Sequence, residues 1–251
     1  MATKPKRYDL TAADRKRNWL VQGGLAAVVV IFAVALVLYI VVSHEKKAGP
    51  GQDKAIRVTS SKLITKPGTS EPKAVLSLYE DFLCPACANF EKNFGSTVNN
   101  LIDSGAVAAD YHMVAILDRP QTQNYSSRAG AAAYCVADQS IDAFRRFHAA
   151  LFSPQIQPRE DASTFPDNKQ LVELARQAGA GGNVADCING GKYTSLVKGI
   201  AAAAKVQATP TIRINGQDYD PTTPQDMVNK IESIVGTVPG LTAGAPANAA
   251  S

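Results

Sequence analysis

The sequence has few of the residues that build metal centres and nucleic-acid interfaces. Its 251 residues include four cysteines, three histidines and one tryptophan. Structural zinc sites usually take four cysteine or histidine ligands, and the sequence has neither a second C-x-x-C pair nor an H-x-x-x-H pair. The net charge of +4 comes largely from the N-terminus, and basic and aromatic residues do not interleave. We therefore expect neither a metal ion nor a nucleic-acid partner.

Long apolar runs are also absent, except between Leu20 and Val42. A helix of about 23 residues spans roughly 34 Å, which is enough to cross a bilayer. Trp19 and Tyr39 lie near the two ends of the run, as interfacial aromatic residues often do. The alternative is a cleaved signal peptide, but the run is longer than a usual h-region and no A-x-A-like site follows it. We expect an uncleaved transmembrane anchor at residues 19–43.

The charges that flank this run favour one orientation. Lys46 and Lys47 follow it closely. The basic residues before it are Lys4, Lys6, Arg7, Arg15, Lys16 and Arg17. Because cytoplasmic flanks carry the excess of positive charge, we expect residues 1–18 in the cytoplasm and the chain beyond the anchor outside it. The cysteines of this single-pass membrane protein are then in an oxidising compartment, where two disulfides are stable.

Beyond the anchor we expect one globular domain between two irregular segments. Residues 44–54 form a linker rich in Gly, Pro and Lys, and residues 237–251 are expected to be disordered. Within residues 55–236, apolar periodicity predicts the elements. Strands are expected at 74–82, 106–117, 211–215 and 218–219, and a short strand or hairpin at 56–64. Helices are expected at 84–104, 126–137, 141–152, 168–178, 193–206 and 224–235. This order predicts an α/β fold with a helical insertion at about 120–206.

The motif Cys84-Pro85-Ala86-Cys87 lies where an apolar strand gives way to a helix. Pro85 suits the first helical position, where its missing N–H is no loss. Free N–H groups and the helix dipole then favour a thiolate at Cys84, whereas Cys87 lies one turn further and is more buried. We predict that Cys84 attacks and Cys87 resolves. The alternatives are half of a zinc site and a structural disulfide, which closes too small a loop to stabilise much.

A second notable proline, Pro210, directly precedes the predicted strand at 211–215. A proline at this position tolerates its missing N–H, which is one explanation. The other is a cis Thr209–Pro210 bond, which X-Pro sequences permit at small cost.

The whole arrangement resembles the DsbA-like branch of the thioredoxin superfamily, and in particular membrane-anchored DsbA-like proteins of mycobacteria and related actinobacteria. The resemblance covers about residues 55–236. The segments that carry it are Glu80 to Cys87, Asp110-Tyr111, Met113 to Leu117, Ser126 to Asp138, Phe144 to His148 and Ala208 to Thr211. It implies a thioredoxin fold with a helical insertion, preceded by a single transmembrane helix.

The resemblance also implies roles for residues at the site. Cys84 is the redox nucleophile and Cys87 the resolving cysteine. Pro210 is cis and lies against the active-site disulfide, and the backbone of Thr209 hydrogen-bonds an extended substrate by strand addition. The residues expected either at an apolar client surface or in the core, with the core favoured for the two phenylalanines, are Phe82, Leu83 and Phe90.

Two positions depart from well-known members of the family. Strongly oxidising members carry His where this chain has Ala86, so thiolate stabilisation must come from backbone N–H groups and the helix terminus. Many thioredoxin-like proteins place a buried acid where this chain has Leu78. Glu80 and Asp81 are the nearby acids that could tune Cys84, and Asp81 is the better placed of the two. The alternative for both is a solvated strand end.

Cys135 and Cys187 both lie in the predicted helical insertion. In an oxidising compartment two such cysteines are most simply one disulfide, and the resemblance indicates the same. A closed loop of about 52 residues gives an entropic gain of roughly 4 kcal/mol. The alternative is a second redox relay. His148, among apolar neighbours, is expected to be a packed or surface residue rather than a catalytic one.

These features predict a membrane-tethered thiol–disulfide oxidoreductase that introduces disulfides into newly exported proteins. The resemblance implies reoxidation by a quinone-linked membrane protein of the VKOR type, and no organic cofactor is expected. Ala86 and Thr209 leave open a reductase or disulfide isomerase on the same fold. A non-enzymatic client-binding or metal-binding module is the more distant alternative.

Overall fold

The computed structural model describes residues 54–239 and Leu241. The chain divides into two compact units, Met1–Pro50 and Gly51–Ser251, and the first lies outside the described residues. The predicted anchor at 19–43 and most of the predicted tail also lie outside them. Within the described part of the chain, no helix has the length and apolar character needed to cross a bilayer.

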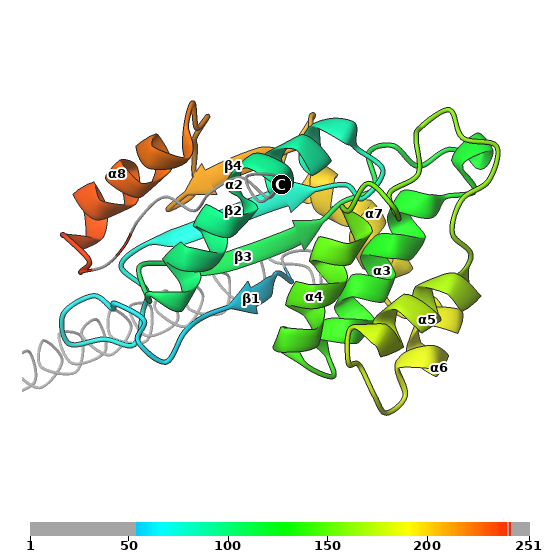
Figure 1. The fold of residues 1–251 in the computed structure, drawn as a ribbon, viewed down its shortest axis with the longest axis horizontal. Helices are drawn as coiled ribbons and strands as arrows, with labels where there is room; N and C mark the ends of the chain where they lie inside the picture. The colour runs from blue at the N-terminus through cyan, green and yellow to red at the C-terminus, as the bar shows by residue number, and fades with distance from the viewer. Residues whose placement is uncertain (1–53, 240, 242–251) are drawn as a thin grey trace, which may run out of the picture. The chain divides into compact units, whose positions relative to one another are not determined.

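A five-stranded sheet in the order β1-β3-β2-β4-β5 forms the centre of the fold (Figure 1). Its central strand β2 pairs in parallel with β3 and antiparallel with β4. The strands are β1 (Ile56–Val58), β2 (Val75–Glu80), β3 (Ala108–Met113), β4 (Thr211–Ile214) and β5 (Gln217–Asp218). Asn215 and Gly216, with φ of 51° and 81°, form the tight turn of the β4–β5 hairpin. The predicted mixed α/β order is confirmed.

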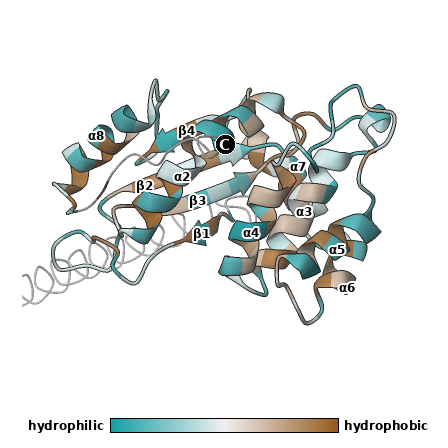
Figure 2. Ribbon diagram, in the orientation of Figure 1, coloured by the Kyte–Doolittle hydropathy of each residue, from teal (hydrophilic) through white to brown (hydrophobic). Residues whose placement is uncertain are grey.

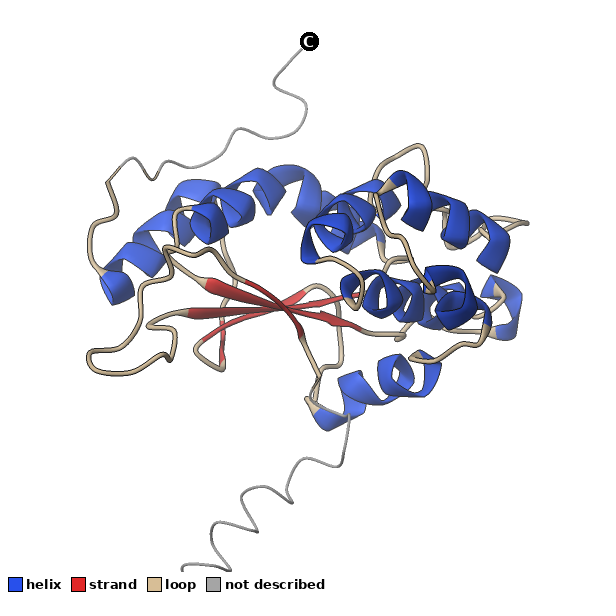
Figure 3. Ribbon diagram, turned by 90° about the horizontal axis from the view of Figure 1, so that it is seen from below, coloured by secondary structure: helices blue, strands red, loops and turns tan. Residues whose placement is uncertain are grey.

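Helices cover both sides of the sheet (Figure 3). On one side α2 (Pro85–Asp103) contacts α8 (Pro224–Val235), and on the other α7 (Thr194–Ala203) contacts β3. Helix α8 has a hydrophobic face and a hydrophilic face (Figure 2), and the hydrophobic face buries Met227 and Ile231. Helices of this kind are stable because one apolar stripe is removed from water against the sheet.

The helical insertion lies between β3 and β4. It comprises η1 (Pro120–Thr122), α3 (Tyr125–Ala137), α4 (Ile141–Leu151), α5 (Asn168–Gln177), α6 (Val184–Asn189) and α7. The alanine-rich helix α3 is its core, and small residues allow close packing. A Cβ atom at Gly130 would approach Val197 Cγ1 to 2.7 Å, so α3 and α7 meet at a glycine.

Two predicted strands end four or more residues after the observed ones. The short strand or hairpin expected at 56–64 ends at Val58, and a turn follows it. The strand expected at 106–117 ends at Met113, although Val114 is also buried. The apolar residues beyond it form a loop whose Leu117 N–H donates to the Asp81 carboxylate instead of to a neighbouring strand. Val114 N–H still donates to the Glu80 carbonyl oxygen of β2 at 2.8 Å, and the half-buried apolar residues after it lie in the loop, which explains the wrong boundary.

Cys135 of α3 and Cys187 of α6 form a disulfide, with 5.8 Å between their Cα atoms. Both helices belong to the insertion, and the bond spans 52 residues of sequence. In the unfolded chain this link excludes many conformations, so it raises the free energy of the unfolded state.

We expect that replacing both cysteines, Cys135→Ala with Cys187→Ala, lowers the free energy of unfolding by about 4 kcal/mol. Urea unfolding of the variant and of the oxidised wild type measures the difference. Reduction of the wild type provides a control that leaves the side chains in place, and it should give a similar loss. Equal unfolding free energies for the oxidised wild type and the variant would contradict the expected role.

Candidate active site

Cys84 is the N-cap residue of α2, and Pro85 occupies the first helical position. The Cys84 backbone N–H donates to the Asp81 carbonyl oxygen at 2.9 Å, which closes a tight turn after β2. No acidic side chain lies in the first turn of α2, so its free N–H groups face no competing carboxylate. Cys84 is 7% exposed and Cys87 is fully enclosed, and both are thiols.

The two thiols have opposite proton affinities. A hydrogen bond from the Cys87 thiol is the largest of several effects that lower the pKa of Cys84 to about 6, against a cost of desolvation. A hydrogen bond from the Thr209 side chain and the backbone N–H groups of Cys87 and Ala86 lower it further. Burial raises the pKa of Cys87 far above its ordinary value. At neutral pH the site therefore holds a thiolate at Cys84 and a thiol at Cys87.

The segment before β4 reaches the same place from the other side. The Thr209–Pro210 peptide bond is cis. The protonated Cys84 thiol donates to the Thr209 carbonyl oxygen at 3.3 Å, across 125 residues of sequence. Because β2 and β4 are antiparallel neighbours, with Tyr79 opposite Thr211, the end of one strand lies beside the start of the other. Strand pairing thus places the proline loop against the nucleophile.

Asp81 is fully buried, so the alternative of a solvated strand end is wrong for it. Its carboxylate accepts hydrogen bonds from the N–H groups of Leu83 and Leu117, each at 2.9 Å. Burial raises its pKa to about 6 despite these donors. The side chain therefore ties the turn that carries Cys84 to the loop after β3.

Glu80 is also fully buried and belongs to a cluster with Glu91 and His148. Glu80 Oε2 and His148 Nε2 are 2.9 Å apart. Burial is the main cause that raises the pKa of Glu80 and of Glu91 to about 8, and burial lowers that of His148. Two enclosed carboxyl groups beside a neutral imidazole retain a proton between them at neutral pH. The Cys84 charge also raises the pKa of Glu80, so this cluster and the thiols influence each other.

The same cluster is the group among residues 54–239 whose donor atoms could hold a cation, since they lie within 4.8 Å of one another. A shared proton satisfies this arrangement without a metal. The sequence singled out Glu80 but not Glu91, although Glu91 follows Cys87 by one helical turn on α2. His148 is packed against Phe82 and Tyr111, as expected from its apolar neighbours, but it also contacts Glu80.

The predicted client-surface residues fall into two groups. Phe82 and Leu83 are fully buried, so Leu83 is a core residue and not part of a client surface. Phe90 is nearly buried, stacks on Phe94 with ring centroids 5.1 Å apart, and lines a cleft of about 370 Å³. The other residues of this cleft are Pro210, Thr211, Ile212, Asp218, Tyr219, Asp220 and Pro221. An open cleft with both apolar and polar walls thus adjoins the cis proline.

Comparison with known proteins identifies the family. Residues 64–233 match the family described as thioredoxin. The chain therefore belongs to the thioredoxin family, and its solved relatives place it in the DsbA-like branch. It is 66% identical to reduced DsbA of Mycobacterium tuberculosis, with a TM-score of 0.73, covering 74% of this chain and 95% of that one. It is 65% identical to the disulfide bond oxidoreductase DsbG of the same organism, with a TM-score of 0.74, covering 78% and 94%.

A relative of a different kind is the serine/threonine-protein kinase PknE of Mycobacterium tuberculosis. The two are 32% identical over 126 residues, which is 49% of this chain and 22% of the kinase. The chain thus spans about a fifth of the length of the curated relatives it matches. The similarity indicates a shared segment, and no activity is transferred from it.

We expect the Cys84 thiolate of the reduced protein to titrate near pH 6, followed by its absorbance at 240 nm. Because the Cys87 thiol is the largest stabilising donor, Cys87→Ala should move the midpoint towards the ordinary value of 9.0. Cys87→Ser retains an O–H donor and is the matched control, with a midpoint that stays low. Equal midpoints in the two variants would contradict the assigned donor.

The raised pKa of Glu91 predicts a pH-dependent stability. The pKa of Glu91 is about 4.3 in the unfolded state and about 8 in the folded state. At a pH between these two pKa values, the native state binds more protons than the unfolded state. The contribution of Glu91 to the free energy of unfolding is therefore greatest below the unfolded-state pKa. It decreases as the pH rises from that pKa to the folded-state pKa. Glu91→Gln cannot ionise, so the fall should be smaller in this variant.

Urea unfolding between pH 5 and pH 8 tests this, with Cys84→Ser and Cys87→Ser in both proteins to remove thiol titration. The same loss of stability with and without Glu91 would show that its carboxyl group does not titrate in this range.

Proposed function

We propose that the protein is a membrane-tethered thiol–disulfide oxidoreductase that introduces disulfides into exported proteins. The observation that carries the proposal is the contrast between the two thiols. Cys84 is a low-pKa thiol at a helix N-terminus beside a cis-proline loop, whereas Cys87 is enclosed and holds its proton. Similarity to DsbA and DsbG of Mycobacterium tuberculosis supports the same activity.

The reaction begins with the oxidised protein. A client thiolate attacks Cys84 Sγ, the Cys84–Cys87 bond breaks, and Cys87 leaves and takes up a proton. A second client thiolate then attacks the client sulfur of the mixed disulfide, and Cys84 departs as a thiolate. The client loses two electrons and gains a disulfide, and the protein becomes a dithiol. A low pKa makes Cys84 a good leaving group and stabilises the reduced protein, which favours oxidation of the client.

Client binding in this proposal uses the cleft beside the proline loop. The Thr209 backbone hydrogen-bonds an extended segment of the client. The apolar side chains of that client segment contact Phe90, Pro210 and Tyr219. An unfolded client exposes such segments, whereas a folded one does not.

Ala86 does not oppose the oxidising direction. Its side chain is exposed, and its contribution to the thiolate comes from its backbone N–H group. The reductase or isomerase alternative rests on the residue types of Ala86 and Thr209, and the reduction potential separates it from the oxidase.

The tether and the electron acceptor are further parts of the proposal. The apolar run between Leu20 and Val42 and the basic residues before it support a single-pass anchor with an extracytoplasmic catalytic domain. A reduced oxidase must transfer two electrons onward. A quinone-linked membrane protein of the VKOR type is the acceptor we infer from the family resemblance.

We expect a reduction potential of about −120 mV for the Cys84–Cys87 pair, in the range of strong oxidases. The full chain is equilibrated in glutathione buffers, alkylated and analysed by peptide mass spectrometry, which separates this pair from Cys135–Cys187. A reduction potential of about −270 mV, like that of thioredoxin, would make the reductase the better assignment. Cys84→Ser should abolish exchange, and a variant that still oxidised clients would exclude the mechanism.

A further inference from the structure

A turn that the proposed reaction does not use lies against the active-site loop. It follows α4 and comprises residues 153–157, here called the 153–157 turn. Phe152, just before it, packs against Phe82 with ring centroids 4.8 Å apart. The Ser153 carbonyl oxygen accepts hydrogen bonds from the N–H groups of Ile156 and Gln157, at 3.0 and 2.9 Å. The turn is therefore tightly closed and fixed to the core at its start.

Gln157 extends from this turn to the backbone that carries the nucleophile. Its Nε2 atom donates to the Phe82 carbonyl oxygen at 3.2 Å and to the Cys84 carbonyl oxygen at 3.1 Å. A carbonyl oxygen can only accept a hydrogen bond, so the two hydrogens on Gln157 Nε2 are the donors to these two oxygens. The Cys84 carbonyl also accepts the first helical hydrogen bond, from Ala88 N at 3.3 Å. One half-buried side chain of the insertion thus spans the turn between β2 and α2.

These contacts bear on the stability of a negative charge at Cys84. A carbonyl oxygen is the negative end of the peptide dipole, and two of them in the same short loop oppose a nearby thiolate. The amide hydrogens of Gln157 offset that negative charge. They also hold the N-cap residue in place, so that the backbone N–H groups of Ala86 and Cys87 stay directed at the sulfur.

We propose that Gln157 is a positioning residue for disulfide exchange. By binding the Phe82 and Cys84 carbonyl oxygens, it fixes the active-site loop and favours the thiolate, and hence the reduced form of the protein. The inference concerns the thiol chemistry of the site and does not depend on which clients are oxidised.

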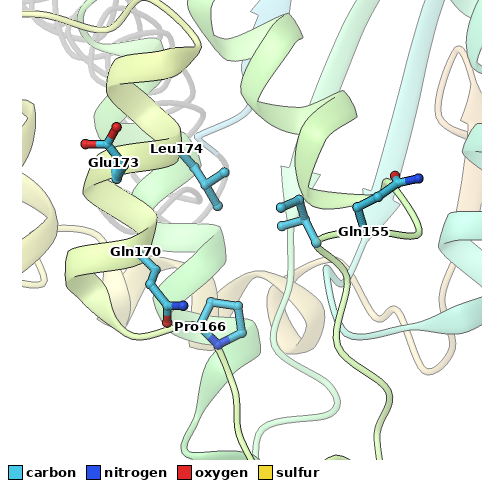
Figure 4. A pocket seen from close by; sticks show the side chains of 6 residues that line it. Gln155, Pro166, Gln170, Glu173 and Leu174 are labelled. Atoms are coloured by element: carbon cyan, nitrogen blue, oxygen red, sulfur yellow. The ribbon is translucent and has the colours of Figure 1, made fainter.

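The same turn supplies a matched control. Gln155, two residues earlier, is exposed and lines an apolar pocket together with Ile156, Pro166 and Leu174 (Figure 4). A charge placed at Gln155 lies in the same turn as Gln157 but does not replace a donor to the active-site loop. Glu80, Asp81 and Cys87, the titratable groups that interact with Cys84, are the same in all variants.

The experiment compares Gln157→Met and Gln157→Glu with Gln155→Met and Gln155→Glu in the full chain. The midpoint of the Cys84 thiolate absorbance and the equilibrium constant with glutathione are measured for each. We expect Gln157→Met to raise the pKa of Cys84 and to favour the disulfide form roughly fivefold, the equivalent of one net hydrogen bond. Gln157→Glu should change both quantities further in the same direction. Both Gln155 variants should stay within about twofold of the wild type.

Two results would overturn the proposal. In the first, Gln157→Met lowers the free energy of unfolding but leaves the thiolate midpoint and the glutathione constant unchanged, which is a purely structural role. In the second, Gln155→Glu changes the midpoint as much as Gln157→Glu does, which is a general effect of charge. A wild-type potential in the reductase range would contradict the proposed oxidase, but the comparison of variants would remain valid.

Discussion

The pairing of β2 with two different neighbours determines where the chemistry of this protein lies. β2 runs parallel to β3 and antiparallel to β4. Its C-terminal end therefore lies next to the end of β3 and the start of β4. The cysteine motif follows β2, and the cis proline precedes β4. A strand order in which β2 and β4 were not neighbours would separate Cys84 from Thr209, and the thiol would have neither its partner loop nor the adjoining cleft.

Burial then distinguishes two side chains that are chemically identical. Cys84 meets backbone donors and the Cys87 thiol, whereas Cys87 is enclosed and desolvated. The same desolvation acts on the acids around them. Glu80 and Glu91 retain a proton between them at neutral pH, so this pair places less negative charge near the thiolate than two carboxylates would. Burial of these two acids is thus compatible with a stable thiolate at Cys84.

Local signals in the sequence predicted most of the fold and the two central cysteines. Pro85 and the apolar run before Cys84 are visible within ten residues. The strands expected at 211–215 and 218–219 left Gly216 and Gln217 as the hairpin turn, one residue later than the observed Asn215 and Gly216. The short helix α6 was missed because six residues give too little periodicity to recognise. The strand after α2 was predicted too long because the half-buried apolar residues after Val114 lie in a loop.

The parts of the site that could not be predicted come from tertiary packing. His148 and Gln157 lie in the insertion, more than sixty residues from Glu80 and Cys84 respectively. A histidine among apolar residues and a glutamine in a loop carry no signal of their own. Leu83 was assigned two alternative roles because its neighbours in sequence fit both. Its complete burial decides for the core, since the turn at Asp81 directs it inward.

Because Ala86 has no ionisable side chain, the Cys84 thiolate is stabilised by other groups. A histidine contributes most when it is protonated, so its effect varies between pH 5 and pH 8. Backbone N–H groups, the helix dipole and the Cys87 thiol do not titrate in that range. These donors give the same electrostatic field across this range, whereas Asp81, whose pKa is about 6, titrates within it. In the proposed oxidase, the oxidising power then depends on how firmly the fold holds the turn from Asp81 to Cys84, which both Asp81 and Gln157 contact.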